Sequence, residues 1–379
     1  MTIRSHPHAW PLRAIDLTVC ALAALLSFAI FMSAGDDFSY DYGNYLGYLE
    51  RLGENSAQEL QSNLETFLPY PYVLVPPAGL FEIGFATLAW ALMASGLSAA
   101  STFAAIGATS IALRVLLLRA LGLRWDFVGL VTVYTVTLFE ANAIRLGCAL
   151  TLTLAALVAL SRQRTTQAIA WLALAGLFHI QSLAFSIPLL TAFTLHRLID
   201  RTILSRVAMF ALVVGGSMAM TLIVQSLEFA KLGDYAESTS GATGLTVVSV
   251  LALLNLVCAA AVFAAPARGM TASDSARRRT WHSALLATVP AVALLWLATS
   301  MGALGDRVWQ FAFAGLIGTI GLIDTHPDAM GTFPRRALTV LLGLCLAISI
   351  INITVRYPLS NFFAPIIPHA PITPFSLVV

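Results

Sequence analysis

The sequence predicts an all-α protein that crosses a membrane many times. The chain of 379 residues is 58% hydrophobic and only 11% charged, and its mean hydropathy is +0.83. Its repeated apolar runs of about 18 or more residues are long enough to span a bilayer as helices. These runs are continuous in Ala, Leu and Val rather than alternating in polarity, which argues against the short strands of a membrane barrel. We therefore expect a polytopic integral membrane protein built from helices.

Charged residues, prolines and glycines divide the chain into about ten to eleven candidate membrane segments. No soluble domain is inserted between them, so we expect residues 1–379 to form a single membrane domain with one long outer-face loop, 35–79. The first run is longer than the apolar core of a signal peptide, and we expect it to remain as an anchor. The segments are 14–34, 80–98, 100–119, 125–141, 143–161, 168–195, 207–227, 244–265, 283–301, 308–324 and 337–355.

Arginine clusters orient these segments, because short cytoplasmic loops are enriched in Lys and Arg. Strict alternation of all the segments would put the clusters at 119–124 and 162–164 on the outer side. The conflict disappears if two segments do not cross the bilayer fully. The best candidate for such a re-entrant pair of half-helices is 168–195, which is interrupted by the polar sequence FHIQS at 178–182. The second irregular piece must lie between residues 35 and 119.

Ionisable side chains within apolar runs indicate cavities or pathways, because each is unfavourable by at least about 2.5–3.5 kcal/mol on insertion scales. With the arginine clusters on the cytoplasmic side, these residues and their polar neighbours gather near the outer ends of the segments. His179 is the exception, because it lies at the interruption. The set is Glu82, Glu140, Asn142, Arg145, His179, Gln181, Ser182, Lys231, Tyr235, Asp306 and Arg307.

Each of these residues also has a purely structural interpretation. Arg145 could be an interface arginine that extends toward the headgroups, and Glu82 could pair with it only to neutralise both charges. His179 could be a hydrogen-bonded core histidine, and Asp306 could be a helix N-cap. The functional signal is the gathering of these residues on one face.

Together, the outer-face residues suit a sugar attached to a lipid diphosphate. Arg145, Lys231 and Arg307 would form a cationic group that holds phosphate oxygens and stabilises a departing diphosphate. Carboxylates accept hydrogen bonds from sugar hydroxyls, and tyrosine rings suit the apolar faces of sugars. The carboxylates are Asp36, Asp37, Asp41 and Glu82, and the tyrosines are Tyr40, Tyr42, Tyr45 and Tyr48.

The cysteines and the net charge indicate neither a metal site nor a nucleic-acid partner. The four cysteines lie in apolar runs, with no CxxC pair and no histidine at ligand spacing, so they are interpreted as small buried side chains. We assign no metal ligand and no cofactor. A net charge of +2 gives no reason to expect nucleic acid.

The order of these polar elements resembles that of the EpsG family of bacterial exopolysaccharide polymerases, which is related to the Wzy group. Leu146 stands where a glutamine is expected after the key arginine, and Gln181 separates His179 from Ser182. The elements that carry the resemblance are GDDFSYDYGNY (35–45), FEIGF (81–85), NAIRLGCAL (142–150), AGLFHIQSLAF (175–185), KLGDY (231–235) and DRVWQF (306–311).

The resemblance implies polymerisation of polyprenyl-diphosphate-linked oligosaccharide repeat units, with a fold similar to multi-span membrane glycosyltransferases. It places the protein in the inner (plasma) membrane, with the active site facing the periplasm or the exterior. A chain-length regulator and a flippase are the pathway partners that it implies, beside the lipid-linked oligosaccharide and the bilayer itself.

We expect an inverting, metal-independent glycosyl transfer in which Arg145, with Arg307 or Lys231, holds the leaving diphosphate. The base is one of His179, Glu82, Asp36 and Asp37. We assign substrate binding to Tyr40, Asp41, Tyr45, Asn142, Lys231, Tyr235 and Arg307.

Two other classes of function stay open. A lipid-linked glycan ligase or a single-sugar membrane glycosyltransferase would share the cationic site and differ in its acceptor. A secondary transporter or lipid flippase would also explain broken helices and buried charge. Two features argue against transport: the chain has no two matching halves, and its polar residues gather at outer ends rather than near mid-span.

Overall fold

The structure is a computed structural model that describes residues 14–32, 42–54, 82–135, 143–179 and 182–199, together with 279–280 and 283–284. The segments expected at 207–227, 244–265, 308–324 and 337–355, and nearly all of 283–301, lie outside these ranges.

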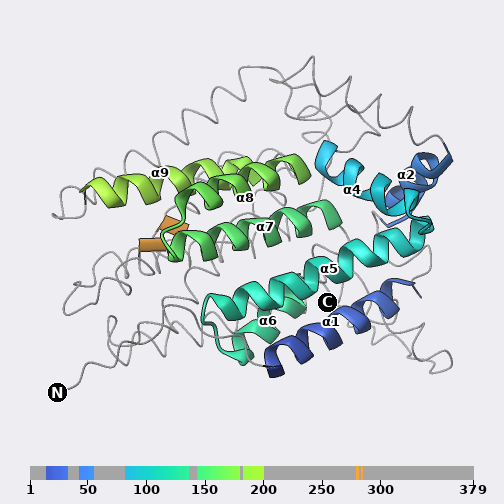
Figure 1. Ribbon diagram of the computed structural model, residues 1–379, viewed down its shortest axis with the longest axis horizontal. Coiled ribbons are helices and arrows are strands. Elements are labelled where there is room, and N and C mark those ends of the chain that lie inside the picture. The colour runs from blue at the N-terminus through green and yellow to red at the C-terminus, as the bar shows by residue number, and fades with distance from the viewer. Residues whose placement is uncertain are drawn as a thin grey trace, which may run out of the picture.

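The described part of the chain is helical and contains no strand, which confirms the all-α prediction (Figure 1). The first four helices are α1 (Ala14–Met32), α2 (Tyr42–Glu54), α4 (Ile83–Ala94) and α5 (Ala99–Ala120). They are followed by α6 (Trp125–Thr135), α7 (Ile144–Ser161), α8 (Thr165–Phe178) and α9 (Leu183–Ile199).

Three of these helices, α1, α5 and α7, are long and apolar enough to cross a bilayer. They contain 19, 22 and 18 residues, and at 1.5 Å per residue each roughly matches the ~30 Å hydrocarbon core. The large side chains of Leu17, Leu22 and Leu25 in α1 are exposed, as suits a helix whose outer side meets lipid. These helices show that this is a membrane protein.

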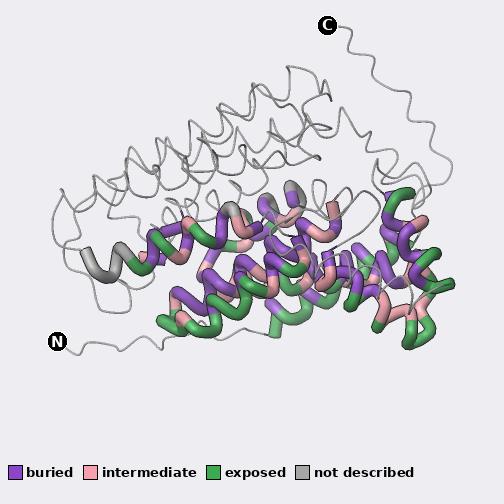
Figure 2. Tube along the Cα trace, turned by 90° about the horizontal axis from the view of Figure 1, so that it is seen from above, coloured by how far each residue is buried: buried purple, intermediate pink, exposed green. Residues whose placement is uncertain are grey.

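The long helices run side by side along the molecule (Figure 1). α1 and α5 are antiparallel, because Asp16 pairs with Arg119 at one end and Phe31 packs edge-on against Phe103 at the other, with ring centroids 5.7 Å apart. α5 and α7 are parallel: Ser110 contacts Thr151 midway, at 3.0 Å between the hydroxyl oxygens. Buried positions line the inner sides of the helices, and exposed positions lie along the outside (Figure 2).

The turns α5–α6 and α7–α8 carry arginines and lie at the same end of the bundle (Figure 1). We call this the arginine end and define it by Arg119, Arg124, Arg162 and Arg164. Gly122 closes the first turn in the left-handed region, at φ 90°, and Leu123 N–H donates to the Leu118 carbonyl at 3.2 Å. A glycine is favoured there because it has no Cβ to clash.

The opposite end of the bundle is covered by α2 and α4 (Figure 1). α2 lies within 35–79, so the segment that the sequence presents as an outer loop contains a helix. The aromatic rings of α2 pack against Phe31, Phe85 and Phe103 in one buried cluster. This cluster fixes α2 to the ends of α1 and α5.

The interruption predicted within 168–195 is confirmed. α8 ends at Phe178, His179 adopts an extended backbone, and α9 begins at Leu183. The two helices run in opposite directions beside each other (Figure 1), so α9 leads the chain back toward the arginine end. This arrangement leaves His179 at the tip of a helical hairpin, facing the end that α2 and α4 cover.

Candidate functional site

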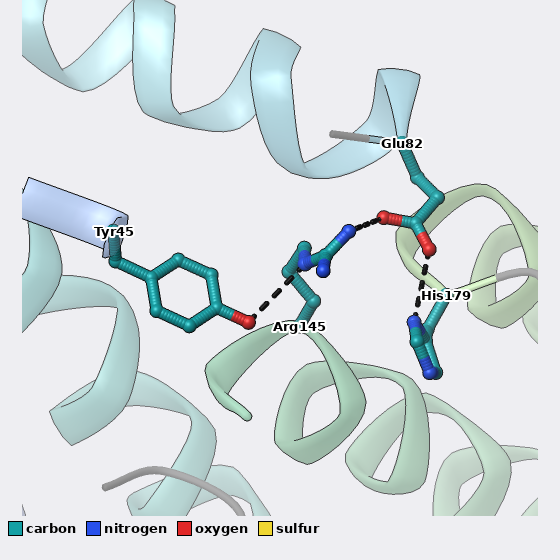
Figure 3. Close-up of polar contacts among 4 residues, drawn as sticks. All are labelled: Tyr45, Glu82, Arg145 and His179. Atoms are coloured by element: carbon teal, nitrogen blue, oxygen red, sulfur yellow. Dashed lines mark hydrogen bonds and ion pairs between the residues drawn. The ribbon is translucent and has the colours of Figure 1, made fainter. Parts of the chain in front are cut away.

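Four polar side chains from four separate segments meet at the end of the bundle opposite the arginine end (Figure 3). Tyr45 comes from α2, Glu82 precedes α4, Arg145 lies in the first turn of α7, and His179 follows α8. We call these residues the polar tetrad. Glu82 and His179 are buried, at 2% and 7% exposure, so their polar atoms depend on protein partners rather than bulk water.

Glu82 is the centre of the tetrad, because its two carboxylate oxygens contact different partners. Oε2 forms an ion pair with Nη1 of Arg145, and Oε1 lies 2.9 Å from Nδ1 of His179. Glu82 occupies the N-cap position of α4, yet its side chain makes no capping hydrogen bond. The carboxylate therefore contacts Arg145 and His179 and does not cap its own helix.

Arg145 lies where a cation is electrostatically unfavourable, in the first turn of α7 at the positive end of the helix dipole. The carboxylate of Glu82 offsets this. Nε of Arg145 also donates to the Tyr45 hydroxyl at 3.2 Å, and the guanidinium carbon lies 5.7 Å from the Tyr45 ring centroid. With a guanidinium and a helix N-terminus together, this position suits an anionic ligand.

His179 is oriented by its backbone and by Glu82. Its N–H donates to the Ala175 carbonyl at 2.9 Å, and its own carbonyl accepts from Ser182 N–H at 2.9 Å. An ionised carboxylate can only accept, so the Nδ1 atom carries the hydrogen in this pair. Nε2 then lies on the side of the ring away from Glu82 (Figure 3). A carboxylate that orients a histidine in this way is a recurring arrangement in acid–base catalysis.

The sequence profile of the EpsG family matches residues 20–365, nearly the whole chain. The protein belongs to the EpsG family. This confirms the resemblance seen in the sequence, and membership suggests a Wzy-like polysaccharide polymerase, because the family is generally glycosyltransferase-like. No curated protein and no solved structure matches the chain.

In this EpsG family member, three residues singled out from the sequence as catalytic candidates, Glu82, Arg145 and His179, come together, and Tyr45 joins them. Among the described residues no group of three or more His, Cys, Asp and Glu side chains could hold a metal ion. The other candidates lie outside the described residues: Asp36, Asp37, Tyr40, Asp41, Asn142, Lys231, Tyr235 and Arg307.

The three tyrosines of α2 have rings that are buried within the protein. Tyr42, Tyr45 and Tyr48 are at most 3% exposed, and their rings belong to the buried aromatic cluster. Tyr42 packs edge-on against Phe103 at 4.9 Å between centroids, and Tyr45 lies 5.8 Å from Phe85. In the structure these rings pack against phenylalanine rings, and their contact with sugar stays a prediction. Tyr45 reaches the site through its hydroxyl.

Arg114 is a buried cation that the sequence interpretation missed. It is 0% exposed in α5, and its Nη2 donates to the Gly147 carbonyl at 2.9 Å and to the Thr151 hydroxyl at 3.2 Å. Both acceptors belong to α7, where Gly147 follows Arg145 by two residues and Thr151 follows it by six. The criterion that identified Arg145, an ionisable residue within an apolar run, also applies to Arg114. Asp16 is a second case, since it lies in the first apolar run and pairs with Arg119.

Proposed function

We propose that this protein polymerises polyprenyl-diphosphate-linked oligosaccharide repeat units by inverting glycosyl transfer on the outer side of the cytoplasmic membrane. The observation that carries the proposal is the buried contact of Glu82 with both Arg145 and His179. It joins a cation suited to a diphosphate with a histidine suited to proton transfer. Family membership supports the polymerase class.

In this reaction a hydroxyl oxygen of the acceptor unit attacks the anomeric carbon of the lipid-linked chain. A glycosidic carbon–oxygen bond forms, and the bond between the anomeric carbon and the diphosphate oxygen breaks. The electron pair of the broken bond leaves with the polyprenyl diphosphate, and the hydroxyl proton passes to a base. The chemistry needs stabilisation of the leaving anion and a positioned proton acceptor.

Arg145 is the proposed diphosphate ligand. Its pairing with Glu82 holds the guanidinium at the N-terminus of α7 in the ligand-free protein. An incoming diphosphate competes with Glu82 for this cation and also meets the positive end of the helix dipole. A planar guanidinium contacts phosphate oxygens through two parallel hydrogen bonds, so we expect lysine to be a poor replacement for Arg145.

His179 is the proposed base, and Glu82 is the residue that orients it. Because Nδ1 donates to Glu82, Nε2 is the ring nitrogen that takes the acceptor proton. The carboxylate then stabilises the imidazolium that forms. Glu82 itself is less suited to act as the base, because both of its oxygens already contact the cation and the imidazole.

The arginine end supports an outer location for the tetrad. Arg145 opens α7 and Arg162 follows its last residue, so the two lie roughly 25 Å apart along the helix axis. Cytoplasmic loops are enriched in Lys and Arg. With the arginine end inside, the tetrad lies toward the outer surface, where polymerisation of exported repeat units takes place.

The test is polymerisation by the purified full-length protein in nanodiscs. The substrate is the lipid-linked repeat unit isolated from cells that lack this protein, and products are sized by gel electrophoresis and mass spectrometry. We expect products of several repeat units from the native protein and none from Arg145→Lys or His179→Ala. Transfer of only one unit would contradict polymerisation and select the ligase class, and polymer from both variants would contradict the roles of these residues.

A further inference from the structure

We infer that Gly84 is a positioning residue, whose missing side chain lets α4 seat directly on the last turn of α8 and thereby holds Glu82 against His179. This inference rests on the proposed function, in which the Glu82–His179 pair moves the acceptor proton. Gly84 follows Glu82 by two residues in the first turn of α4.

The space beside Gly84 is filled by backbone. A Cβ atom at this position would lie 2.8 Å from the Leu177 carbonyl oxygen, 2.9 Å from the Leu177 carbonyl carbon and 3.0 Å from Cδ2 of Phe178. Real Cβ atoms essentially never approach another heavy atom within 3.0 Å. The carbonyl of Leu177 belongs to α8 and cannot rotate away as a side chain can. An alanine at 84 must therefore separate the two helices by several tenths of an ångström.

This contact is close in the chain to both members of the Glu82–His179 pair, because Gly84 follows Glu82 by two residues and Leu177 precedes His179 by two. The Glu82 carbonyl accepts from Ala86 N–H at 3.1 Å, which ties Glu82 to the first turn of α4. His179 N–H donates to Ala175 at 2.9 Å, which ties His179 to α8. Each member of the pair is thus fixed to one of the two helices. A shift between the helices therefore changes the 2.9 Å distance between the Glu82 carboxylate and Nδ1 of His179. Protein hydrogen bonds weaken beyond about 3.2 Å.

Helix propensity alone predicts that Gly84→Ala does no harm to the protein. Gly84 is inside a helix without a left-handed φ, where alanine is ordinarily the more stable residue. If the glycine had no packing role, Gly84→Ala would leave activity unchanged. Because a misplacement of about 1 Å in a catalytic geometry can lower a rate by roughly 100-fold, we expect a large loss instead.

Other glycines of the chain provide matched controls. A Cβ atom at Gly43 in α2 or Gly129 in α6 would meet nothing within 4 Å. At Gly53 the nearest atom is the terminal methyl of Met93, at 2.7 Å, and a flexible methyl can move aside. We therefore expect Gly43→Ala and Gly129→Ala to behave as the native protein and Gly53→Ala to lose little activity.

The experiment compares kcat and KM of Gly84→Ala and Gly129→Ala with isolated lipid-linked repeat units as substrate. We expect kcat of Gly84→Ala to fall at least tenfold with KM unchanged within a factor of about two. In a Glu82→Gln background, where the pair is already impaired, adding Gly84→Ala should lower kcat by less than twofold, because the two changes act through the same contact. A tenfold further loss in that background would contradict the inference.

A cross-linking measurement in membranes covers the case in which Gly84→Ala yields little protein. Cysteines at Ile83 and Phe178, in a chain without its native cysteines, are bridged by a short bifunctional thiol reagent. We expect a lower bridged fraction with Gly84→Ala than without it, and an equal fraction would overturn the inference. If the native protein makes no product longer than one unit, the proposed function is wrong, and if Glu82→Gln and His179→Ala both keep native kcat, the roles proposed for these two residues are wrong. If they lose it while Gly84→Ala matches Gly129→Ala, only the role of Gly84 is wrong.

Discussion

The Nδ1 atom of His179 lies 2.9 Å from the carboxylate of Glu82, although 97 positions separate the two residues in the sequence. The same carboxylate pairs with Arg145, which reaches Tyr45 in turn. One buried acid thus links a candidate base to a candidate diphosphate ligand. Substitutions at these residues can separate their chemical roles from their structural ones.

Glu82→Gln keeps the shape of the side chain and removes its charge. The glutamine can still contact His179, but it no longer stabilises an imidazolium or opposes the charge of Arg145. We expect kcat for polymerisation to fall by roughly 100-fold or more, within the range of general acid–base catalysis. The control is Glu50→Gln, which changes an exposed glutamate of α2. Equal activity of the two variants in the nanodisc assay would exclude Glu82 from the chemistry.

Tyr45→Phe removes only the hydroxyl that accepts from Arg145. The ring can stay in the aromatic cluster, so we expect a modest decrease in unfolding free energy of about 0.5–1.5 kcal/mol and a weaker hold on the guanidinium. Repeat-unit KM should rise several-fold. Tyr42→Phe is the matched control, because the Tyr42 hydroxyl donates to the Phe31 carbonyl at 3.4 Å. A KM effect of the same size in Tyr42→Phe would show that loss of a buried hydroxyl in α2, and not loss of the contact with Arg145, is responsible.

Arg114→Met tests the buried contact between α5 and α7. Losing charged hydrogen bonds to Gly147 and Thr151 should lower the unfolding free energy by about 2–3 kcal/mol, seen as a lower Tm in detergent. The control is Arg124→Met, since Arg124 and Asp126 form an exposed pair at 2.9 Å, and such pairs contribute about 0–1 kcal/mol. Equal Tm values for the two variants would contradict a structural role for Arg114.

Thiol labelling tests the orientation of the bundle. In a chain without native cysteines, Glu50→Cys lies near the tetrad end and Asp126→Cys lies near the arginine end, and both positions are exposed. We expect a membrane-impermeant maleimide to label Glu50→Cys in intact spheroplasts and Asp126→Cys only after lysis. The reverse pattern would put the tetrad on the cytoplasmic side and contradict the proposal that the reaction takes place on the outer side of the membrane.

The sequence was sufficient to predict the helical membrane fold and to single out all four members of the tetrad, Tyr45 as a substrate-binding residue. Glu82, Arg145 and His179 are visible because ionisable groups are unfavourable inside apolar runs. The pairing of Glu82 with Arg145 was one of the interpretations that the sequence allowed. The contact of Glu82 with His179 was not predicted, because contacts across 63 and 97 positions depend on how the helices pack. The break at His179 was predictable from the polar residues that interrupt an apolar run.

Two features were missed although the sequence contains a signal for each. The buried positions Tyr42, Tyr45, Leu49 and Leu52 recur at helical spacing, which predicts α2, but the surrounding charges favoured a loop interpretation. Arg114 satisfies the same criterion as Arg145. Its position five residues before Arg119 and ten before Arg124 also suits an arginine at the membrane interface.

The central claim is that Glu82 and Arg145 take part in the reaction and do not merely neutralise each other. Single changes leave one charge buried, which can destabilise a protein by about 3–5 kcal/mol and obscure the result. The double variant Glu82→Gln/Arg145→Met removes both charges, and it keeps the shape of the side chain at 82 and an unbranched, flexible side chain at 145.

The decisive measurement is therefore polymer formation by this double variant, beside its Tm and its level in the membrane. We predict a Tm within a few degrees of the native protein and higher than that of Arg145→Met alone, with no product longer than the starting repeat unit. Native polymer lengths from the double variant would show that the pair is only a neutralised contact between helices, and would contradict the account.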